Sequence, residues 1–164
     1  MLNISKKPIL IVGGGPVGLT LAWRLSQAGL PVLVFEAEIE IADQLRASTF
    51  HPPTLDMFDA SGITAEIIAK GRITPEWQIR MLATGEKARF DLGVLKDDTD
   101  HPYRLQCKQA ELSRALLDRL ADGVVCFEAK VSEVFQDASG VFAVVNGQKI
   151  GGSILVGCDG ARSV

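Results

Sequence analysis

The chain has few of the residues that bind metal ions or carry thiol chemistry. It contains three cysteines and two histidines among 164 residues. Cys107, Cys126 and Cys158 are widely spaced and form no Cys-x-x-Cys pair, so we interpret them as buried or incidental thiols, with reactive thiols as the alternative. His51 and His101 are isolated from each other, and two histidines are too few for a zinc site. The sequence therefore predicts no metal centre.

The chain also lacks an excess of positive charge and a long apolar run. Its formal net charge is −3 and its pI is about 5.4, which argues against a nucleic acid partner. No stretch approaches the roughly 18 consecutive apolar residues of a membrane span. Residues 1–8 place their lysines after the apolar residues, unlike a secretory signal. We therefore expect a cytoplasmic, globular protein whose 47% hydrophobic residues form a core.

A glycine-rich motif follows the first apolar stretch. Ile9–Val12 leads directly into Gly13, Gly15, Pro16 and Gly18, which fit the pattern G-x-G-x-x-G. The first glycine permits a tight strand-to-helix turn, the second lets the backbone approach a pyrophosphate, and the third lets the helix pack on the strand. Proline suits the first helical turn, and the free N–H groups there favour an anion. The motif predicts a dinucleotide site built from backbone groups.

An acidic residue follows the second expected strand at the distance that such a site requires. Val32–Phe35 ends at Glu36, 21 residues after Gly15, and a carboxylate there can accept hydrogen bonds from a ribose diol. An acid at this position favours FAD or NAD over NADP. The segment does not separate FAD from NAD, and a glycine-rich turn without a ligand is the alternative.

The rest of the chain alternates helix and strand signals. Proline starts, glycine stops and apolar residues every four positions predict helices, while apolar runs and the turn signal Asn146-Gly147 predict strands. The fold class is therefore α/β, a Rossmann-like domain with a parallel sheet and an antiparallel β-meander, incomplete at the C-terminus. The expected elements are helices over 52–62, 64–70 and 108–121, a hairpin over 78–91, a buried strand over 124–127, a meander over 131–150 and an apolar strand over 154–157.

Three separated motifs resemble those of the class A flavoprotein monooxygenases, the aromatic-ring hydroxylase family of para-hydroxybenzoate hydroxylase. One is Gly13 to Gly18 with Glu36, and another is Arg46-Ala47-Ser48 before the next helix. The third, Asp159-Gly160-Ala161-Arg162-Ser163, resembles the D-G-x-x-S motif of the family and is more specific than the glycine pattern. The similarity spans essentially the whole chain and implies that residues 1–164 are the N-terminal FAD-binding part of such an enzyme.

The resemblance implies roles in FAD binding for particular residues. Glu36 would hold the adenosine ribose, while Arg46 and Gln109 would reach the pyrophosphate and the ribityl chain. The backbone of Val131 would flank the adenine, and Asp159 would serve FAD and the nicotinamide donor. Without the resemblance, Arg46 would be interpreted as a surface charge and Gln109 as a helix start. Val131 would be a core valine and Asp159 a turn residue. The full set of cofactor-binding residues is Gly13, Gly15, Pro16, Val17, Gly18, Glu36, Ala37, Arg46, Gln109, Val131 and Asp159, and none is assigned a catalytic role.

The resemblance also implies the activity of the whole enzyme. NAD(P)H would reduce FAD, the reduced flavin would form a C4a-hydroperoxide with O₂, and a small aromatic substrate would be hydroxylated. The chain stops before a second flavin motif of the family, so we expect residues 1–164 to be a truncated domain that is inactive alone. Residues 77–105 would be a strand and loop excursion toward a missing substrate domain. A flavin halogenase or oxidase relative and a non-catalytic nucleotide-binding fragment are the alternatives.

Overall fold

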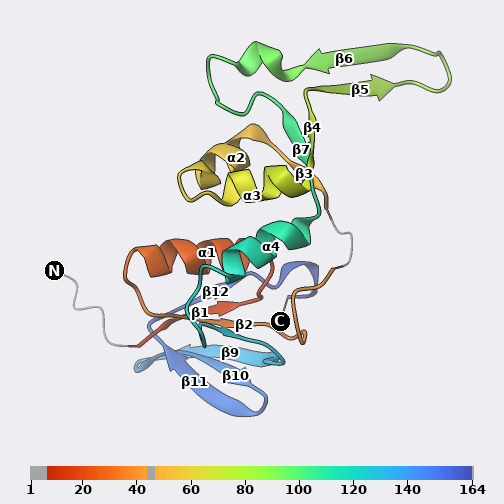
Figure 1. Ribbon diagram of the computed structural model, residues 1–164. Helices are drawn as coiled ribbons and strands as arrows, with labels where there is room; N and C mark the ends of the chain where they lie inside the picture. The colour runs from red at the N-terminus through yellow and green to blue at the C-terminus, as the bar shows by residue number, and fades with distance from the viewer. Residues whose placement is uncertain (1–6, 44–46, 164) are drawn as a thin grey trace. The chain divides into compact units, whose positions relative to one another are not determined.

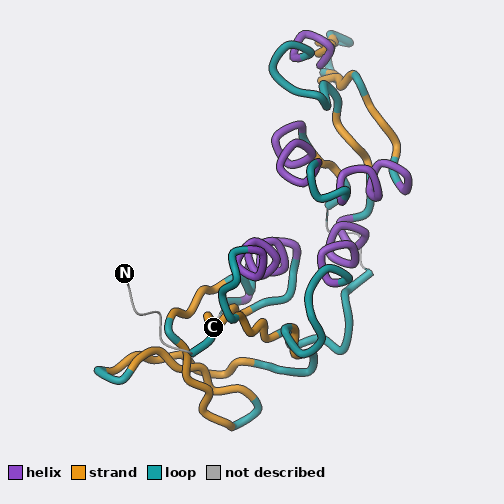
Figure 2. Tube along the Cα trace, turned by 60° about the vertical axis from the view of Figure 1, so that its left-hand side comes forward, coloured by secondary structure: helices purple, strands orange, loops and turns teal. Residues whose placement is uncertain are grey.

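Two compact units make up the chain in the computed structural model, which describes residues 7–43 and 47–163. The first unit consists of residues 1–42 and 116–164, and the second of residues 43–115. The first unit holds a parallel sheet, helix α1 and the meander, whereas the second holds short helices and antiparallel strands (Figures 1 and 2).

A four-stranded parallel sheet forms the centre of the first unit. β1 (Ile9–Val12) pairs with β2 (Val32–Phe35) on one side and with β12 (Ile154–Gly157) on the other, and β8 (Val125–Cys126) follows β2. This arrangement confirms the predicted parallel α/β sheet. The prediction of a buried strand over 124–127 is wrong in extent and in burial. Only the two residues of β8 pair with β2, and they lie half-buried at the edge of the sheet.

Alternate residues of the same strands bury the two faces of this sheet. One face packs against helix α1 (Pro16–Gln27), and the other packs against the meander (Figure 1). Because α1 and the meander cover both faces of the sheet, every residue of β1 and β2 can be apolar, and the two strands are continuous apolar runs. The buried residues on the helix side are Ile9, Ile11, Ala22, Val32 and Val34, and those on the meander side are Leu10, Val12, Phe35, Ala129, Val131, Ala143 and Val145.

The meander has the predicted antiparallel order. β10 (Gly140–Val145) lies between β9 (Val131–Asp137) and β11 (Gln148–Gly152). The turn between the last two strands contains Asn146 at φ 48° and Gly147 at φ 80°. Both residues tolerate the left-handed region, which is why this dipeptide joins strands through a two-residue turn.

The second unit contains a small antiparallel sheet beside its helices. The sheet has the order β3-β7-β4, from β3 (Thr49–Phe50), β7 (Arg104–Gln106) and β4 (Arg72–Thr74). Helices α2 (Pro52–Asp59) and α3 (Ile63–Lys70) contact each other and confirm the two predicted helices, although α2 ends at Asp59 instead of 62. Helix α4 (Gln109–Leu117) is shorter than the predicted 108–121, because the chain turns at Asp118 and Arg119.

A hairpin with two chemically different faces extends this unit. β5 (Glu76–Arg80) pairs with β6 (Lys87–Asp91), and the short helix η1 (Leu92–Leu95) follows. Residues that pair directly share a face of the ribbon, so one face carries the pairs Trp77 with Phe90 and Ile79 with Ala88. The opposite face carries charged and amide side chains. The hairpin confirms the prediction over 78–91.

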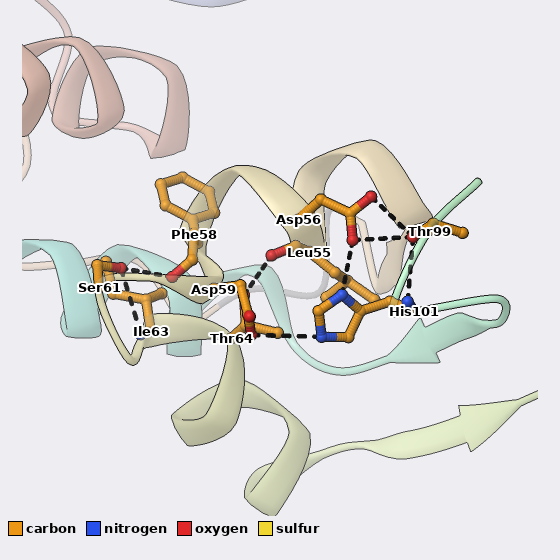
Figure 3. Close-up of polar contacts among 9 residues, drawn as sticks. All are labelled: Leu55, Asp56, Phe58, Asp59, Ser61, Ile63, Thr64, Thr99 and His101. Carbon is orange, nitrogen blue, oxygen red and sulfur yellow. Dashed lines mark hydrogen bonds and ion pairs between the residues drawn. The ribbon is translucent and has the colours of Figure 1, made fainter. Parts of the chain in front are cut away.

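A buried histidine links the loop before β7 to helix α2 (Figure 3). Nδ1 of His101 lies 2.7 Å from Asp56 Oδ1, and Nε2 lies 3.4 Å from Asp59 Oδ1. The hydroxyl of Thr99 donates to Asp56 and accepts a hydrogen bond from the His101 backbone N–H. Nearby, the hydroxyl of buried Thr64 donates to the Leu55 carbonyl and holds α3 against α2. Thr99 and His101 therefore hold this loop against α2.

Metal-binding clusters and membrane-spanning helices are both absent from the described residues. No group of three or more His, Cys, Asp or Glu residues in this part of the chain could hold a metal ion. No helix within the ranges 7–43 and 47–163 is long and apolar enough to cross a bilayer.

Candidate functional site

The carboxyl ends of three neighbouring parallel strands bring the main candidate residues together. Val12 of β1 pairs with Phe35 of β2 and with Gly157 of β12. The segments that follow these three residues therefore leave the sheet at the same edge, and they carry the glycine loop, Glu36 and Asp159. In open α/β sheets this edge is where ligands bind.

Gly13 and Gly18 are needed for the tight packing of the loop. Gly13 has φ 103°, and a Cβ atom there would lie 2.5 Å from the carbonyl oxygen of Cys158. A Cβ atom at Gly18 would lie 2.0 Å from the carbonyl oxygen of Gly13. Any side chain at either position would force apart backbone segments that are in contact. The predicted conformational roles of these two glycines are confirmed, with Gly18 packing on the loop carbonyl as well as near Ile11 of β1.

Gly15 differs from these two glycines, because a Cβ atom there would meet no atom of the described residues within 4 Å. Its φ of −72° is accessible to any residue, and it precedes the first turn of α1 as the N-cap. Pro16 occupies the first turn as predicted, and Val17 is 67% exposed. The free N–H groups and the positive end of the helix dipole therefore begin directly after a position at which the described residues leave room for a Cβ atom.

Glu36 is held in place by backbone N–H groups. Its Oε2 accepts a hydrogen bond of 2.7 Å from Gly14 N–H, and its Oε1 accepts one of 3.0 Å from Glu38 N–H. A Cβ atom at Gly14 would lie 2.9 Å from the Cβ of Glu36. Gly14 was not predicted as a site residue, because the pattern G-x-G-x-x-G leaves this position free. The available signal was that the middle residue of the run Gly13-Gly14-Gly15 is also glycine.

Asp159 follows β12 at the same edge and precedes the short helix η2 (Gly160–Arg162). The N–H of Cys158 donates to the Val12 carbonyl over 2.7 Å, which fixes the start of this segment beside the glycine loop. Burial raises the pKa of the Cys158 thiol, and the charge of Asp159 adds to the rise. The thiol therefore stays protonated near neutral pH and is a poor nucleophile.

The remaining predicted residues lie elsewhere. Ala37 is exposed directly after Glu36, and Val131 is a buried core residue at the start of β9 in the meander. Gln109 begins α4 in the second unit, where its N–H donates to the Ala47 carbonyl over 3.2 Å. Arg46 lies outside the described residues. The structure thus gathers Gly13, Gly15, Pro16, Val17, Gly18, Glu36, Ala37 and Asp159 at one sheet edge, with Val131 in the core of the same unit.

Comparison with known proteins identifies a family for nearly the whole chain. Residues 6–164 match the family described as the FAD binding domain. The chain is 34% identical, over 96% of its length, to 6-hydroxy-3-succinoylpyridine 3-monooxygenase of Pseudomonas putida. It is 33% identical, over 94% of its length, to para-nitrophenol 4-monooxygenase of a Pseudomonas species. The chain spans only 42% and 40% of these two relatives.

Solved structures agree with these matches. The crystal structure of p-nitrophenol 4-monooxygenase from Pseudomonas putida superimposes with a TM-score of 0.83 at 32% identity, covering 96% of this chain and 42% of the other. The flavin-dependent monooxygenase PieE, solved in complex with FAD and substrate, superimposes with a TM-score of 0.79 at 25% identity, covering 96% and 31%. The predicted fold class and the resemblance to flavoprotein monooxygenases are therefore confirmed.

Proposed function

Because this chain belongs to the FAD binding domain family, we propose that the glycine loop holds the pyrophosphate of FAD and that Glu36 holds its adenosine ribose. The observation that carries this proposal is the convergence of Gly15, Glu36 and Asp159 beyond three adjacent parallel strands. We assign the rest of the cofactor contacts to Gly13, Pro16, Val17, Gly18, Ala37, Arg46, Gln109, Val131 and Asp159.

The residues at the sheet edge fit the ADP half of FAD. The open space at Gly15 allows the backbone to approach a phosphate, and the N-terminus of α1 supplies donors for its oxygens. Each carboxylate oxygen of Glu36 accepts one backbone hydrogen bond and keeps further acceptor capacity for the ribose hydroxyls. The two backbone bonds also fix the orientation of this carboxylate before a ligand arrives.

We further propose that the whole protein is an NAD(P)H-dependent monooxygenase that hydroxylates a small aromatic compound. The names of both relatives support this, since each is a monooxygenase of a compound with an aromatic ring. When bound, the flavin would accept a hydride from NAD(P)H, activate O₂ and pass one oxygen atom to the ring while the other leaves as water. The described residues serve binding and orientation, and no catalytic residue is assigned. We propose a cytoplasmic location, which supplies NAD(P)H.

The excursion over residues 77–105 is part of the same proposal. It contains the hairpin whose apolar face is exposed, with Ile79 at 47% and Phe90 at 40% accessibility. A two-stranded hairpin alone is marginally stable in water, so an apolar face of this kind is expected to have a partner surface. We propose that this segment contributes to the substrate-binding part of the enzyme.

Flavin binding to the purified 164-residue chain tests the proposal. We expect a Glu36→Gln variant to bind FAD about tenfold more weakly, equivalent to about 1.4 kcal/mol, because a neutral amide replaces an anionic acceptor of ribose hydroxyls. Glu38→Gln is the matched control, since that side chain is exposed and only its backbone N–H contacts Glu36 among the hydrogen bonds of the described residues. FMN lacks the adenosine, so the substitution should leave FMN binding unchanged. Equal losses of FAD affinity in both variants would contradict the ribose assignment.

A further inference from the structure

An ion-pair cluster lies at the start of helix α4 in the second unit. Each carboxylate oxygen of Asp43 accepts one hydrogen bond of 3.1 Å, from Lys108 Nζ and from Arg114 Nη2. Nη1 of Arg114 donates to Glu111 over 2.8 Å, and Lys70 at the end of α3 donates to the other oxygen of Glu111 over 2.8 Å. Hydrogen bonds from Lys108 and then Arg114 lower the pKa of Asp43, which keeps its carboxylate ionised at neutral pH. These five side chains therefore form one connected network of charges.

The chain is held at the start of α4 on both sides of residues 44–46. Before them, the ion pairs of Asp43 hold it through side chains. After them, the N–H of Gln109 donates to the Ala47 carbonyl over 3.2 Å, and the N–H of Cys107 donates to the Ser48 carbonyl over 2.8 Å. The cluster and the two backbone hydrogen bonds therefore fix where this part of the chain meets α4 and where it leaves it.

The two residues of the second unit that we assign to FAD are next to these attachments in the chain. Arg46 directly precedes Ala47, and Gln109 is the residue whose N–H binds the Ala47 carbonyl. A segment that becomes ordered only when its ligand arrives loses conformational entropy at that moment, and this loss weakens binding. A segment that is already fixed at both ends loses less. Attachment at Asp43 is therefore expected to favour binding of a ligand by Arg46 and Gln109.

We propose that Asp43 is a positioning residue for FAD binding and that it acts through its ion pairs with Lys108 and Arg114. By holding the chain before residues 44–46 at the start of α4, it allows Arg46 and Gln109 to bind the same ligand. The inference rests on the proposed function, because it takes FAD as that ligand. It goes beyond that function by assigning a role to three charged residues that are not among the assigned cofactor contacts.

Two substitutions of opposite charge separate positioning from long-range attraction. Asp43→Asn removes a negative charge, whereas Arg114→Gln removes a positive one. If the cluster only attracted the phosphates of FAD, the two variants would shift FAD affinity in opposite directions. Loss of positioning instead weakens FAD binding in both, by about three- to fivefold, because solvent screens exposed ion pairs and limits their strength. Glu40→Gln is the matched control and should keep wild-type affinity, since it removes an exposed acid from the same connection after β2.

Exchanging the charges of one pair provides a rescue. Asp43→Lys alone places two cations together, whereas Asp43→Lys combined with Lys108→Asp restores an ion pair in the reverse order. We expect the double variant to bind FAD more tightly than Asp43→Lys alone. Thermal melts of each variant report folding, and the double variant carries the test if a single variant does not fold.

Flavin fluorescence measures FAD affinity, and amide hydrogen exchange of the FAD-free chain reports the attachment itself. The Gln109 N–H should exchange about threefold faster in Asp43→Asn than in Glu40→Gln, because its hydrogen bond to Ala47 opens more often. This second measurement does not depend on whether FAD is the ligand.

Four results would overturn the inference. They are equal FAD affinities of Asp43→Asn and Glu40→Gln, opposite shifts in Asp43→Asn and Arg114→Gln, no rescue by the exchanged charges, or equal exchange rates of the Gln109 N–H. Each of them leaves FAD binding by the wild-type chain intact, and with it the proposed function. A wild-type chain that binds no FAD overturns the proposed function and this inference together.

Discussion

Replacing Gly15 by alanine should separate cofactor binding from folding. The added methyl group would project into open space, since no atom of the described residues lies within 4 Å of it. If the pyrophosphate of FAD lies against this backbone, the methyl group occupies the same space. We therefore expect FAD affinity to fall at least tenfold, or about 1.4 kcal/mol.

The stability of the Gly15→Ala chain should hardly change. Its φ of −72° suits alanine, and restricting the unfolded chain gains about 0.4–1 kcal/mol. Alanine is a poorer N-cap than glycine by roughly the same amount, so the two effects nearly cancel. Gly18→Ala should behave in the opposite way, because its methyl group would lie 2.0 Å from the Gly13 carbonyl oxygen. Overpacking of this kind costs about 1–3 kcal/mol and should lower the melting temperature by roughly 2–12 °C.

Circular dichroism melts and FAD titration by flavin fluorescence measure the two effects on the same preparations. The expected pattern is an unchanged melting temperature with weak FAD binding for Gly15→Ala, and a lowered melting temperature for Gly18→Ala. Wild-type FAD affinity in the Gly15→Ala chain would refute the placement of the pyrophosphate at this loop. A wild-type melting temperature for Gly18→Ala would refute the tight contact between α1 and the loop.

Two further predictions concern the second unit. Hydrogen bonds from His101 and then Thr99 lower the pKa of Asp56 from its ordinary value of 3.8. Since the pKa of Asp56 is lower in the folded state, its ionised form stabilises the fold above the unfolded pKa, and this stabilisation is lost as pH falls through the folded pKa. In urea unfolding, the free energy of unfolding should therefore fall less between about pH 7 and about pH 3 for Asp56→Asn than for wild type. An equal fall in both chains would contradict this role of Asp56. Thr64→Val should lower the free energy of unfolding by about 1 kcal/mol, because the Leu55 carbonyl loses its buried hydroxyl donor. Urea denaturation checks this value, and no change would mean that the hydrogen bond contributes nothing.

Local patterns were enough to predict the elements that carry the cofactor site. The apolar run before Gly13, the proline at the start of α1 and the acid after β2 each have a local physical cause, and the structure has all three features. Asn146-Gly147 likewise fixed the last turn of the meander. The predictions succeeded where one segment determines its own conformation.

Local patterns do not predict which strands pair when the strands are far apart in the sequence. The sheet β3-β7-β4 consists of strands of two or three residues, too short to show an alternating pattern, and their partners are far apart in sequence. The contact between Gly14 and Glu36 depends on the parallel register of β1 and β2, which no local pattern gives. Burial of β8 was overestimated, because an apolar run does not reveal that its strand lies at an edge.

The close packing of Gly14 against Glu36 means that the two positions cannot vary independently. A Cβ atom at position 14 would lie 2.9 Å from the Cβ of Glu36, so alanine there would displace the carboxylate from the Gly14 N–H. If position 14 alone is randomised, the chains that fold and bind FAD should have glycine there. If positions 14 and 36 are randomised together, such chains should also include pairs in which residue 36 has a shorter side chain or a displaced backbone. In this chain, packing therefore fixes Gly13, Gly14 and Gly18, and the acidic residue at position 36 can change only together with position 14.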